Sequence, residues 1–324
     1  MVAKVVICGA GFLGSSVAKL ILSTANNAPR RVQLLSRKPS TTQDAISKDL
    51  NPTDLERLEK PADADITKPD TLSAAIKDAD VVVSLVGIMH GSMEDFERIQ
   101  WRGAENVARA ARDARAKLIH ISAIGADTSS NVPYERTKAL GEDAVLSLCP
   151  DATVIRPSIL FGPGDGFFGR FAQLSKVLPV MPVFGGGKSR FQPVYVEDVA
   201  RLVEIISRRD IALRSAVDGK TIEVGGPDVF SYREIMELVL RYTNRKRPIV
   251  SVPYGIGTMQ GFFLERLPTN MFTLTRAQVE QLKKDNIVNP ATFDRSPPFE
   301  DILQKEGYGL HSVHDILPTY LFDV

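Results

Sequence analysis

The chain carries near its start the stretch Ile7-Cys8-Gly9-Ala10-Gly11-Phe12-Leu13-Gly14, which follows an apolar run and precedes the periodic stretch Ser15–Leu22. This order predicts a strand, a glycine turn and a helix. Gly9 allows the backbone angles of a tight turn, Gly11 lets the chain approach a phosphate, and Gly14 lets the helix pack on the strand. Free N–H groups at the start of the helix, from Phe12 and Leu13 onward, would face the anion. The turn therefore predicts a bound dinucleotide; the alternative is a turn that serves packing alone.

Composition places the chain among ordinary globular proteins. It has 324 residues, 44% of them hydrophobic and 24% charged, with a formal net charge of +1. The balanced charge and the lack of a long basic run argue against a nucleic-acid surface. No apolar run approaches the roughly 18 residues of a membrane-spanning helix. The first strand begins so near Met1 that no secretory signal or mitochondrial presequence is visible. Cys8 and Cys149 are expected to be buried thiols in a reducing compartment.

Short apolar runs alternate with helix-like stretches through the first half of the chain. Such strands, apolar on both faces, indicate parallel βαβ units. We therefore predict an α/β fold, a Rossmann-type doubly wound parallel sheet with a smaller C-terminal lobe, whose ligand crevice lies at the carboxyl ends of the strands. The expected strands are Val2–Cys8, Val32–Ser36, Asp80–Val86, Leu118–Ser122 and Ala152–Ile155, and the expected helices are Phe12–Thr24, Thr71–Lys77, Glu94–Arg115 and Glu135–Leu148.

Proline and glycine become frequent after Pro157 and predict long loops there. We expect a dinucleotide-binding domain at residues 1–161 and a smaller substrate or partner lobe at 162–324. Within that lobe, residues 194–224 are expected to return to the main sheet, through a helix that begins near Val196 and a strand at Thr221–Val224.

The residues after the second strand bear on the choice of dinucleotide. NAD sites usually have Asp or Glu here to bind the ribose 2′-hydroxyl, whereas NADP sites have Arg. This chain has Ser36, Arg37 and Lys38, and the two cations suit the 2′-phosphate. We favour NADP(H) over NAD; the alternative is a solvated basic loop. Asp65 and Ile66, before the next helix, are placed to meet the adenine, and a helix-capping or surface aspartate is the alternative.

Tyr134 and Lys138 are four residues apart and so share one face of a predicted helix. A neighbouring ammonium stabilises a tyrosine phenolate, and such a pair can pass a proton to a carbonyl that is being reduced. Ser122, at the end of a strand, would orient the substrate oxygen. The same spacing is common on solvated helix faces, so both interpretations stay open.

Together these motifs resemble those of the short-chain dehydrogenase/reductases of the extended or atypical kind. The resemblance implies cofactor contacts at Val86, Gly87, Lys138 and Pro157, and an NADPH that is often retained without demonstrable turnover. Within the family the chain resembles the branch of the nucleotide-binding accessory subunit of respiratory complex I (alpha subcomplex subunit nine) and its bacterial and fungal relatives. The resemblance rests on the glycine turn, Asp65-Ile66, Ser84–Gly87, Ser122–Ala126, Tyr134 with Lys138, Arg156–Pro163, Phe191–Ala200, Gly225–Pro227, Tyr232–Glu234 and Asp285–Val288.

Two features depart from the family pattern. Its turn commonly reads G-x-x-G-x-x-G, whose first glycine would fall at Cys8, so Gly9 shifts the spacing and predicts a tighter phosphate loop. Ser122 precedes Tyr134 by only 12 residues, fewer than in active extended enzymes, which would displace Ser122 from the Tyr134 hydroxyl. These departures bear on turnover more than on cofactor binding.

Other residues support weaker interpretations. The four histidines include one H-x-x-H pair, His311 and His314, but without a cysteine cluster or an H-E-x-x-H helix we predict no metal site. Arg156 and Arg190 would hold an anionic group or form structural ion pairs. Two apolar stretches are interpreted as the core of the small lobe or as a docking face for a partner subunit or a membrane surface. The first comprises Phe167–Phe171 and Val177–Phe184, the second is Ile256–Leu267 with Met259, Phe262, Phe263 and Leu264, and Lys176 and Arg266 lie at their rim.

Three functions follow. The first, implied by the resemblance, is a non-spanning NADP(H)-binding protein that serves complex I or ubiquinone biosynthesis, with a structural or slowly turned-over cofactor. Its partners would be respiratory-chain or quinone-synthesis proteins, with peripheral membrane contact, on the matrix side of the inner mitochondrial membrane or in a bacterial cytoplasm. The second is an active NAD(P)-dependent oxidoreductase or epimerase that uses Tyr134 and Lys138 on a carbonyl substrate. The third is an interaction module whose crevice is vestigial.

Overall fold

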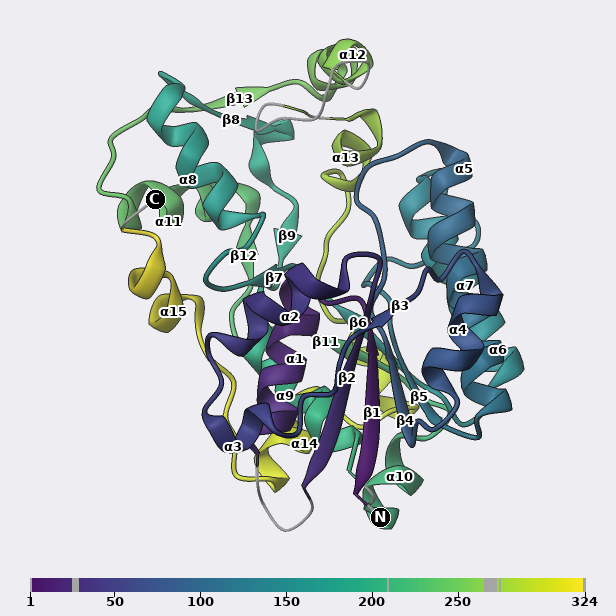
Figure 1. Cartoon of the computed structure of the whole chain (residues 1–324). Coiled ribbons are helices and arrows are strands. Elements are labelled where there is room, and N and C mark those ends of the chain that lie inside the picture. Colours follow the sequence, from purple (N-terminus) through teal and green to yellow (C-terminus); the bar gives the residue numbers. More distant parts are fainter. Residues whose placement is uncertain (1, 25–28, 209, 265–272, 274, 323–324) are drawn as a thin grey trace. The chain divides into compact units, whose positions relative to one another are not determined.

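The protein is described here by a computed structural model, which covers residues 2–24, 29–208, 210–264, 273 and 275–322 (Figure 1). The chain divides into two compact units. The first consists of Met1–Pro157, Val196–Val224 and Pro290–Gly309, and the second of Ser158–Tyr195, Gly225–Asn289 and Leu310–Val324. The return of Pro290–Gly309 to the first unit has no counterpart in the sequence patterns.

The first unit is built on a parallel sheet. Seven strands of the described chain follow the order β11-β6-β5-β4-β1-β2-β3, and each neighbouring pair is parallel. This confirms the predicted α/β fold with a Rossmann-type doubly wound sheet. The strands are β1 (Ala3–Cys8), β2 (Arg30–Ser36), β3 (Ala62–Asp63), β4 (Val81–Ser84), β5 (Lys117–Ile121), β6 (Thr153–Pro157) and β11 (Thr221–Val224).

Helices cover both faces of this sheet, which explains why its central strands are apolar on both sides. Helix α1 packs against α9 on one face, while α4, α6 and α7 lie together on the other (Figure 1). The helices of this unit are α1 (Phe12–Ser23), α2 (Pro39–Ser47), α3 (Pro52–Leu55), α4 (Pro69–Ile76), α5 (Met93–Phe96), α6 (Gly103–Asp113), α7 (Pro133–Leu148), α9 (Val196–Ile206), α10 (Ile211–Val217) and α14 (Phe299–Lys305).

One expected helix differs from the prediction. The sequence predicts a continuous α-helix over Glu94–Arg115, but the structure has a π-helix, Glu97–Arg102, between α5 and α6. A π-helical turn contains one more residue than an α-helical turn, and the spacing of apolar residues in this short segment does not reveal it. Such turns often lie at functional sites. The expected helix from Val196 and the strand Thr221–Val224 are both confirmed.

The second unit contains short paired strands and helices. Strand β7 (Leu160–Phe161) pairs with β10 (Val194–Tyr195), β8 (Met181–Phe184) with β13 (Ile249–Val252), and β9 (Arg190–Phe191) with β12 (Phe230–Ser231). The aromatic ring of Phe168 packs against Phe161 and Phe167, and Phe171 packs against Phe167 and Tyr232, so the first apolar stretch contributes to the core of this unit. Its helices are α8 (Phe168–Val177), α11 (Tyr232–Tyr242), α12 (Tyr254–Leu264), α13 (Arg276–Gln281) and α15 (Val313–Tyr320).

No helix among the described residues combines the length and the apolar character that crossing a bilayer requires.

Candidate functional site

The glycine turn joins β1 to α1 as the sequence predicts. Gly9 has φ +105°, and its N–H donates to the carbonyl oxygen of Leu35 at 3.2 Å. A Cβ atom on Gly9 would lie 3.1 Å from Cγ2 of Val86. The turn therefore touches both neighbouring strands, and Gly9 meets the segment after β4 that was predicted to contact the cofactor.

Gly11 and Gly14 serve different purposes in this turn. A Cβ on Gly14 would lie 1.9 Å from the carbonyl oxygen of Gly9, whereas a Cβ on Gly11 would meet no atom within 4 Å. Gly11 is the N-cap of α1, makes no side-chain cap bond, and is followed by a first turn without an acidic residue. The start of α1, with Phe12 and Leu13, thus keeps open space beside N–H groups that suit an anion.

The basic residues after β2 lie at the same edge of the sheet. Arg37 and Lys38 are exposed, and the main-chain N–H of Lys38 donates to Ser36 Oγ at 3.1 Å. Asp65 is half-buried, and Thr67 donates to its Oδ1 from both main-chain N and Oγ1, at 2.9 and 2.8 Å. Burial acts to raise the pKa of Asp65, but the Thr67 hydrogen bonds and the Arg37 charge outweigh it and leave the pKa lowered. Asp65 is therefore ionised and close enough to Arg37 to feel its charge.

Ile66 contacts helix α6 through both its main chain and its side chain. Its carbonyl oxygen accepts a hydrogen bond from Asn106 Nδ2 at 2.8 Å, and a Cβ on Gly103 would lie 2.5 Å from Ile66 Cδ1. Gly103 thus lets α6 approach Ile66 closely.

Lys138 is the buried cation of the site. Its Nζ donates to the carbonyl oxygen of Ile121 at 3.1 Å, and a Cβ on Gly87 would lie 3.2 Å from the same nitrogen. The structure thus brings together Lys138 from α7 and Gly87 from the segment after β4. Burial lowers the pKa of Lys138 to about 8, although the nearby Glu142 carboxylate acts to raise it.

Gln100, which the sequence analysis missed, connects the same two segments. It is 2% exposed, and its Nε2 donates to Thr137 Oγ1 at 2.9 Å while its Oε1 accepts from the N–H of Ile88 at 3.3 Å. Gln100 lies in the π-helix, so the irregular turn places an amide between the cofactor loop and α7. No local pattern signals this role, because both bonds reach residues distant in sequence.

Tyr134 and Ser122 are less tightly organised. Tyr134 is half-buried at the start of α7 against Phe96, with ring centroids 6.5 Å apart, and burial of its hydroxyl raises its pKa to about 12. Ser122 is 3% exposed, and among the described residues its Oγ has no hydrogen-bond partner, Tyr134 included. The missing Ser122–Tyr134 hydrogen bond agrees with the displacement that the short spacing between the two residues predicts, and it leaves a buried hydroxyl available.

His120, on β5 two residues before Ser122, is a second buried polar group without a partner. Neither of its ring nitrogens has a hydrogen bond within the described chain. Burial, with a smaller effect from the Lys138 charge, lowers the pKa of His120 to about 3.

Pro157 is the last residue of β6, and its carbonyl oxygen accepts a hydrogen bond from the N–H of Ile124, two residues after Ser122, at 3.0 Å. Arg156, one residue earlier, makes a bidentate ion pair with Glu142, at 2.9 and 2.6 Å, so its charge is held structurally. In the second unit, Arg190 is likewise paired with Asp285 at 2.7 Å.

The described residues contain no cluster of three or more His, Cys, Asp or Glu side chains placed to hold a metal ion. Cys8 and Cys149 are buried free thiols, and burial raises the pKa of Cys8 to about 12.

These residues fit a dinucleotide. The unobstructed Gly11 at an uncapped helix start suits a pyrophosphate, and the buried Ser122 hydroxyl and Lys138 amine lie on strands and helices of the same unit. These residues offer a helix start that suits an anion, the buried Lys138 ammonium, and a Ser122 hydroxyl without a hydrogen-bond partner among the described residues. Such groups suit a nucleotide and a polar group beside it.

Comparison with known proteins agrees with this geometry. Residues 5–225, more than half of the chain, match the model of the NAD dependent epimerase/dehydratase family. The mitochondrial NADH dehydrogenase [ubiquinone] 1 alpha subcomplex subunit 9 of Arabidopsis thaliana is 31% identical over 242 residues, which cover 72% of this chain and 58% of that protein. A ceramide reductase of Caulobacter vibrioides is 31% identical over 191 residues, 58% of each chain. The chain thus spans less than two thirds of the length of these curated relatives.

Solved structures share the fold at low identity. A dTDP-glucose 4,6-dehydratase of Streptomyces venezuelae with NAD and TYD bound has a TM-score of 0.70 at 16% identity, covering 98% of this chain and 95% of that one. A dTDP-4-dehydrorhamnose reductase of Bacillus anthracis in complex with NADP has a TM-score of 0.62 at 16% identity, covering 99% of both chains. At these identities the likeness concerns the fold alone.

Proposed function

The chain belongs to the NAD-dependent epimerase/dehydratase family, and from this membership we propose that it is an NADP(H)-holding protein of the respiratory chain or of ubiquinone biosynthesis. The observation that carries the proposal is the open space at Gly11, where an uncapped helix starts on a glycine turn. The cofactor would supply a hydride when bound. The protein would hold its pyrophosphate with Gly9, Gly11, Phe12, Leu13 and Gly14, and its remaining parts with Ser36, Arg37, Lys38, Asp65, Ile66, Val86, Gly87, Lys138 and Pro157.

The preference for NADP(H) over NAD rests on Arg37. Its guanidinium is exposed after β2 and has no ion-pair partner among the described residues, so it is available to a 2′-phosphate. Asp65, whose pKa the Arg37 charge helps to lower, accepts hydrogen bonds from Thr67. An aspartate or glutamate after β2 that accepts a hydrogen bond from the ribose 2′-hydroxyl would instead favour NAD.

The test is a pair of binding titrations, following NADPH and NADH fluorescence. Arg37→Ala should weaken NADPH binding about tenfold, the loss of one charge-assisted contact, and leave NADH binding unchanged. Lys48→Ala, an exposed cation after α2, is the matched control and should change neither. Equal effects of Arg37→Ala on both nucleotides would contradict the cofactor choice.

We propose that the cofactor is retained rather than rapidly turned over. The high pKa of Tyr134, about 12, makes its hydroxyl a poor proton donor at neutral pH, and Ser122 does not bond to it. Lys138 directs its ammonium to the carbonyl of Ile121. These features support a role in holding nucleotide.

A second candidate, an active oxidoreductase or epimerase acting on a carbonyl, is favoured by the buried Lys138 with its pKa of about 8 and by the unpaired Ser122 hydroxyl. Lys138 would lower the cost of a Tyr134 phenolate, and Ser122 would orient the substrate oxygen. The two candidates differ in the effect of Tyr134→Phe. An active enzyme should lose most of its NADPH oxidation with a carbonyl or quinone, whereas a holding protein should show no such rate and keep its nucleotide.

We propose respiratory-chain partners, a mitochondrial location on the matrix side of the inner membrane, and a cytoplasmic location if the source is bacterial. Mitochondrial complex I subunits among the homologues support this. Exposed apolar side chains on α12, Ile256 at 50% and Met259 at 61%, support a peripheral docking face. Arg266 and the side chains of Phe262, Phe263 and Leu264, also predicted there, lie outside the described residues.

Native electrophoresis of solubilised membranes tests the partner. The chain should co-migrate with a large complex and keep NADPH after washing, and Met259→Glu should release it while leaving NADPH binding intact. If the wild-type chain from solubilised membranes migrates at the size of the chain by itself, the proposal of a respiratory-chain partner is wrong.

A further inference from the structure

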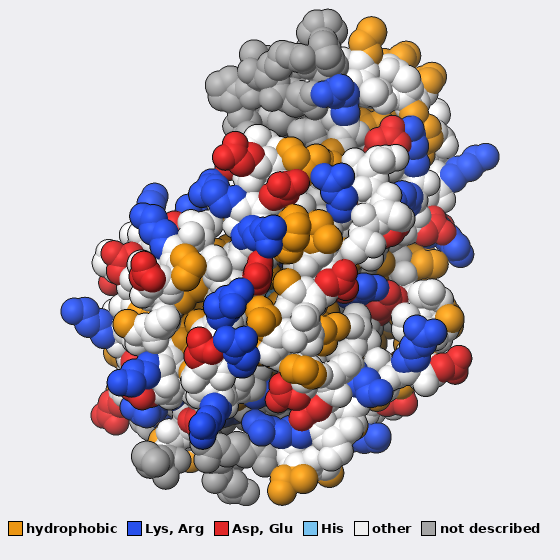
Figure 2. Space-filling view, turned by 90° about the vertical axis from the view of Figure 1, so that its right-hand side faces the viewer, with side chains coloured by type: hydrophobic (Ala, Val, Ile, Leu, Met, Phe, Trp, Pro, Cys, Tyr) orange, Lys and Arg blue, Asp and Glu red, His pale blue; other side chains and the backbone are white. Residues whose placement is uncertain are grey.

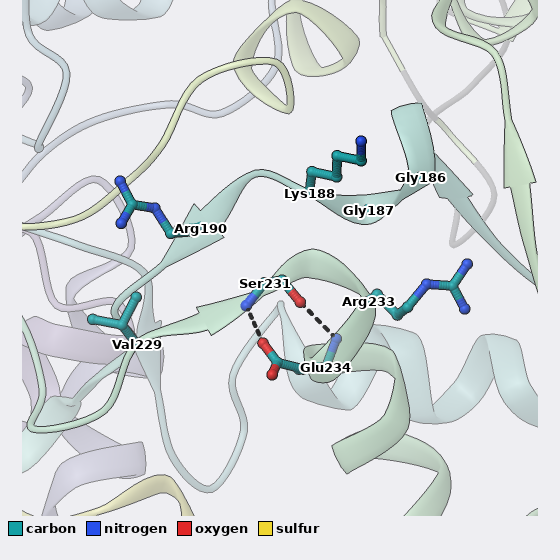
Figure 3. Close-up of a pocket in the computed structure, with 8 residues that line it drawn as sticks. All are labelled: Gly186, Gly187, Lys188, Arg190, Val229, Ser231, Arg233 and Glu234. Atoms are coloured by element: carbon teal, nitrogen blue, oxygen red, sulfur yellow. Dashed lines mark hydrogen bonds between the residues drawn. The ribbon is translucent and has the colours of Figure 1, made fainter.

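A pocket in the second unit is built by residues outside the dinucleotide site. Its volume is about 390 Å³, within the usual range for small-molecule pockets. It lies between the segment that leads into β9 and the start of α11 (Figure 3). Its lining residues are Gly186, Gly187, Lys188, Arg190, Val229, Ser231, Arg233 and Glu234.

Consecutive glycines form one wall of the pocket. Gly185, Gly186 and Gly187 all have positive φ, at 57°, 80° and 69°, so the turn follows a path that other residues rarely adopt. A Cβ on Gly187 would lie 2.9 Å from the main-chain nitrogen of Arg233. The glycine turn therefore packs directly on the first turn of α11. In Figure 3, Lys188 extends from the segment before β9 and Arg233 from the start of α11, while Arg190 lies farther along the strand.

The short antiparallel pairing of β9 with β12 sets the other wall. Arg190 is opposite Ser231, and Phe191 is opposite Phe230. Because side chains alternate along a strand, Arg190 and Ser231 line the pocket, while Phe191 points the other way and packs on Tyr232. One face of this ribbon thus belongs to the core and the other to the pocket.

The charges around the pocket are not balanced by the protein. Within the described residues, neither Lys188 nor Arg233 has a carboxylate at ion-pair distance, and Arg190 is paired with Asp285 at 2.7 Å. Glu234, the acid of the lining, accepts the N–H of Ser231 at 2.7 Å in a capping box. Hydrogen bonds from Ser231 lower the pKa of Glu234, so it stays ionised in that role.

The position of Arg233 is unfavourable for the helix itself. It is the second residue of α11, where the macrodipole disfavours a cation. An arginine there adds nothing to helix stability, and beside the unpaired Lys188 it raises the positive potential. Both effects are relieved by a bound anion.

We propose that this pocket binds a small ligand that carries a phosphate monoester. Arg233 would contact the phosphate through its guanidinium fork and Lys188 as a point charge, while Arg190 stays shared with Asp285. The volume exceeds that of a phosphate group, so an organic portion would lie toward Val229. The same chemistry is offered by a free phosphorylated compound and by the headgroup of phosphatidic acid.

The test compares two arginines on one helix. Arg233→Gln removes the proposed contact, and Arg241→Gln, exposed in the last turn of α11, is the matched control. Full-length protein saturated with NADPH, which keeps phosphate from the glycine turn, is titrated with inorganic phosphate and, separately, sedimented with phosphatidylcholine vesicles with and without phosphatidic acid. Arg233→Gln and Lys188→Gln should each weaken binding about tenfold, and Arg241→Gln should not.

The two arms separate the sources of the phosphate. Binding of inorganic phosphate that depends on Arg233 supports a free phosphorylated compound, and binding only to vesicles with phosphatidic acid supports a lipid headgroup. No binding in either arm, or equal binding by the Arg233 and Arg241 variants, would overturn the proposal. Thermal melts of each variant keep the comparison valid, because Arg233→Gln should leave the melting temperature unchanged or slightly raised.

Discussion

A Cβ atom on Gly14 would lie 1.9 Å from the carbonyl oxygen of Gly9. The first turn of α1 therefore rests directly on the main chain of the glycine turn, with no room for a side chain. The contact fixes where the helix starts relative to β1, and so fixes the direction of the N–H groups that would face an anion.

Gly14→Ala should therefore destabilise the protein strongly. The backbone at residue 9 has to move, and overpacking of this severity costs about 3 kcal/mol. Urea unfolding followed by circular dichroism measures the loss. A variant within about 0.5 kcal/mol of wild type would show that the turn yields easily and that its geometry is not fixed by this contact.

Gly11→Ala should behave in the opposite way. No atom lies within 4 Å of the added Cβ, and alanine at an N-cap costs less than about 1 kcal/mol. The methyl group would instead stand where a pyrophosphate approaches, so NADPH binding should weaken at least tenfold with the fold intact. Unchanged affinity in a fluorescence titration would remove the glycine turn from the proposed cofactor site.

Lys138 predicts a pH effect on stability. Its pKa is about 8 in the folded chain and 10.5 as an ordinary lysine, so the unfolded state holds more protons between these values. Stability from this group therefore rises as pH rises from 8 to 10, by at most about 1.4 kcal/mol per pH unit. The difference in unfolding free energy between wild type and Lys138→Met should change with that slope, and a constant difference would contradict burial of the ammonium.

His120 predicts an effect at acidic pH. Its pKa is about 3 in the folded chain against 6.5 ordinarily, so the unfolded state takes up its proton first. Wild type should lose stability relative to His120→Leu as pH falls from 6.5 to 4, by up to about 1.4 kcal/mol per unit. Parallel curves for wild type and His120→Leu would show that His120 is not buried as neutral imidazole.

The distribution of charged side chains on the surface concerns the kind of partner that the protein can bind, rather than its fold. In the view of Figure 2, basic and acidic side chains are interspersed with small hydrophobic areas. This mixture agrees with the net charge of +1 and with the absence of a nucleic-acid-like basic run in the sequence.

Much of the first unit is predictable from local patterns. All six strands predicted for the sheet are present, since β1, β2, β4 to β6 and β11 each overlap the predicted range, whereas β3 was not predicted. This works because parallel strands covered by helices on both faces are apolar along their whole length. It also works because the turn between β1 and α1 needs backbone angles that glycine adopts readily. The π-helix escaped prediction because its residues continue the helical pattern on both sides.

The sequence by itself thus determined the central strands of the sheet, the glycine turn and the residue types of the proposed site, since these depend on near neighbours in the chain. Tertiary structure alone decided which residues meet: Lys138 with Gly87, Gln100 with Thr137, and Arg156 with Glu142. It also placed Lys188 and Arg233 in the lining of one pocket. Within the described part of the chain, it also left the polar side-chain atoms of Ser122 and His120 buried without a hydrogen-bond partner. Such contacts join segments far apart in sequence, and their distances follow from how whole helices and strands pack, which no local pattern encodes.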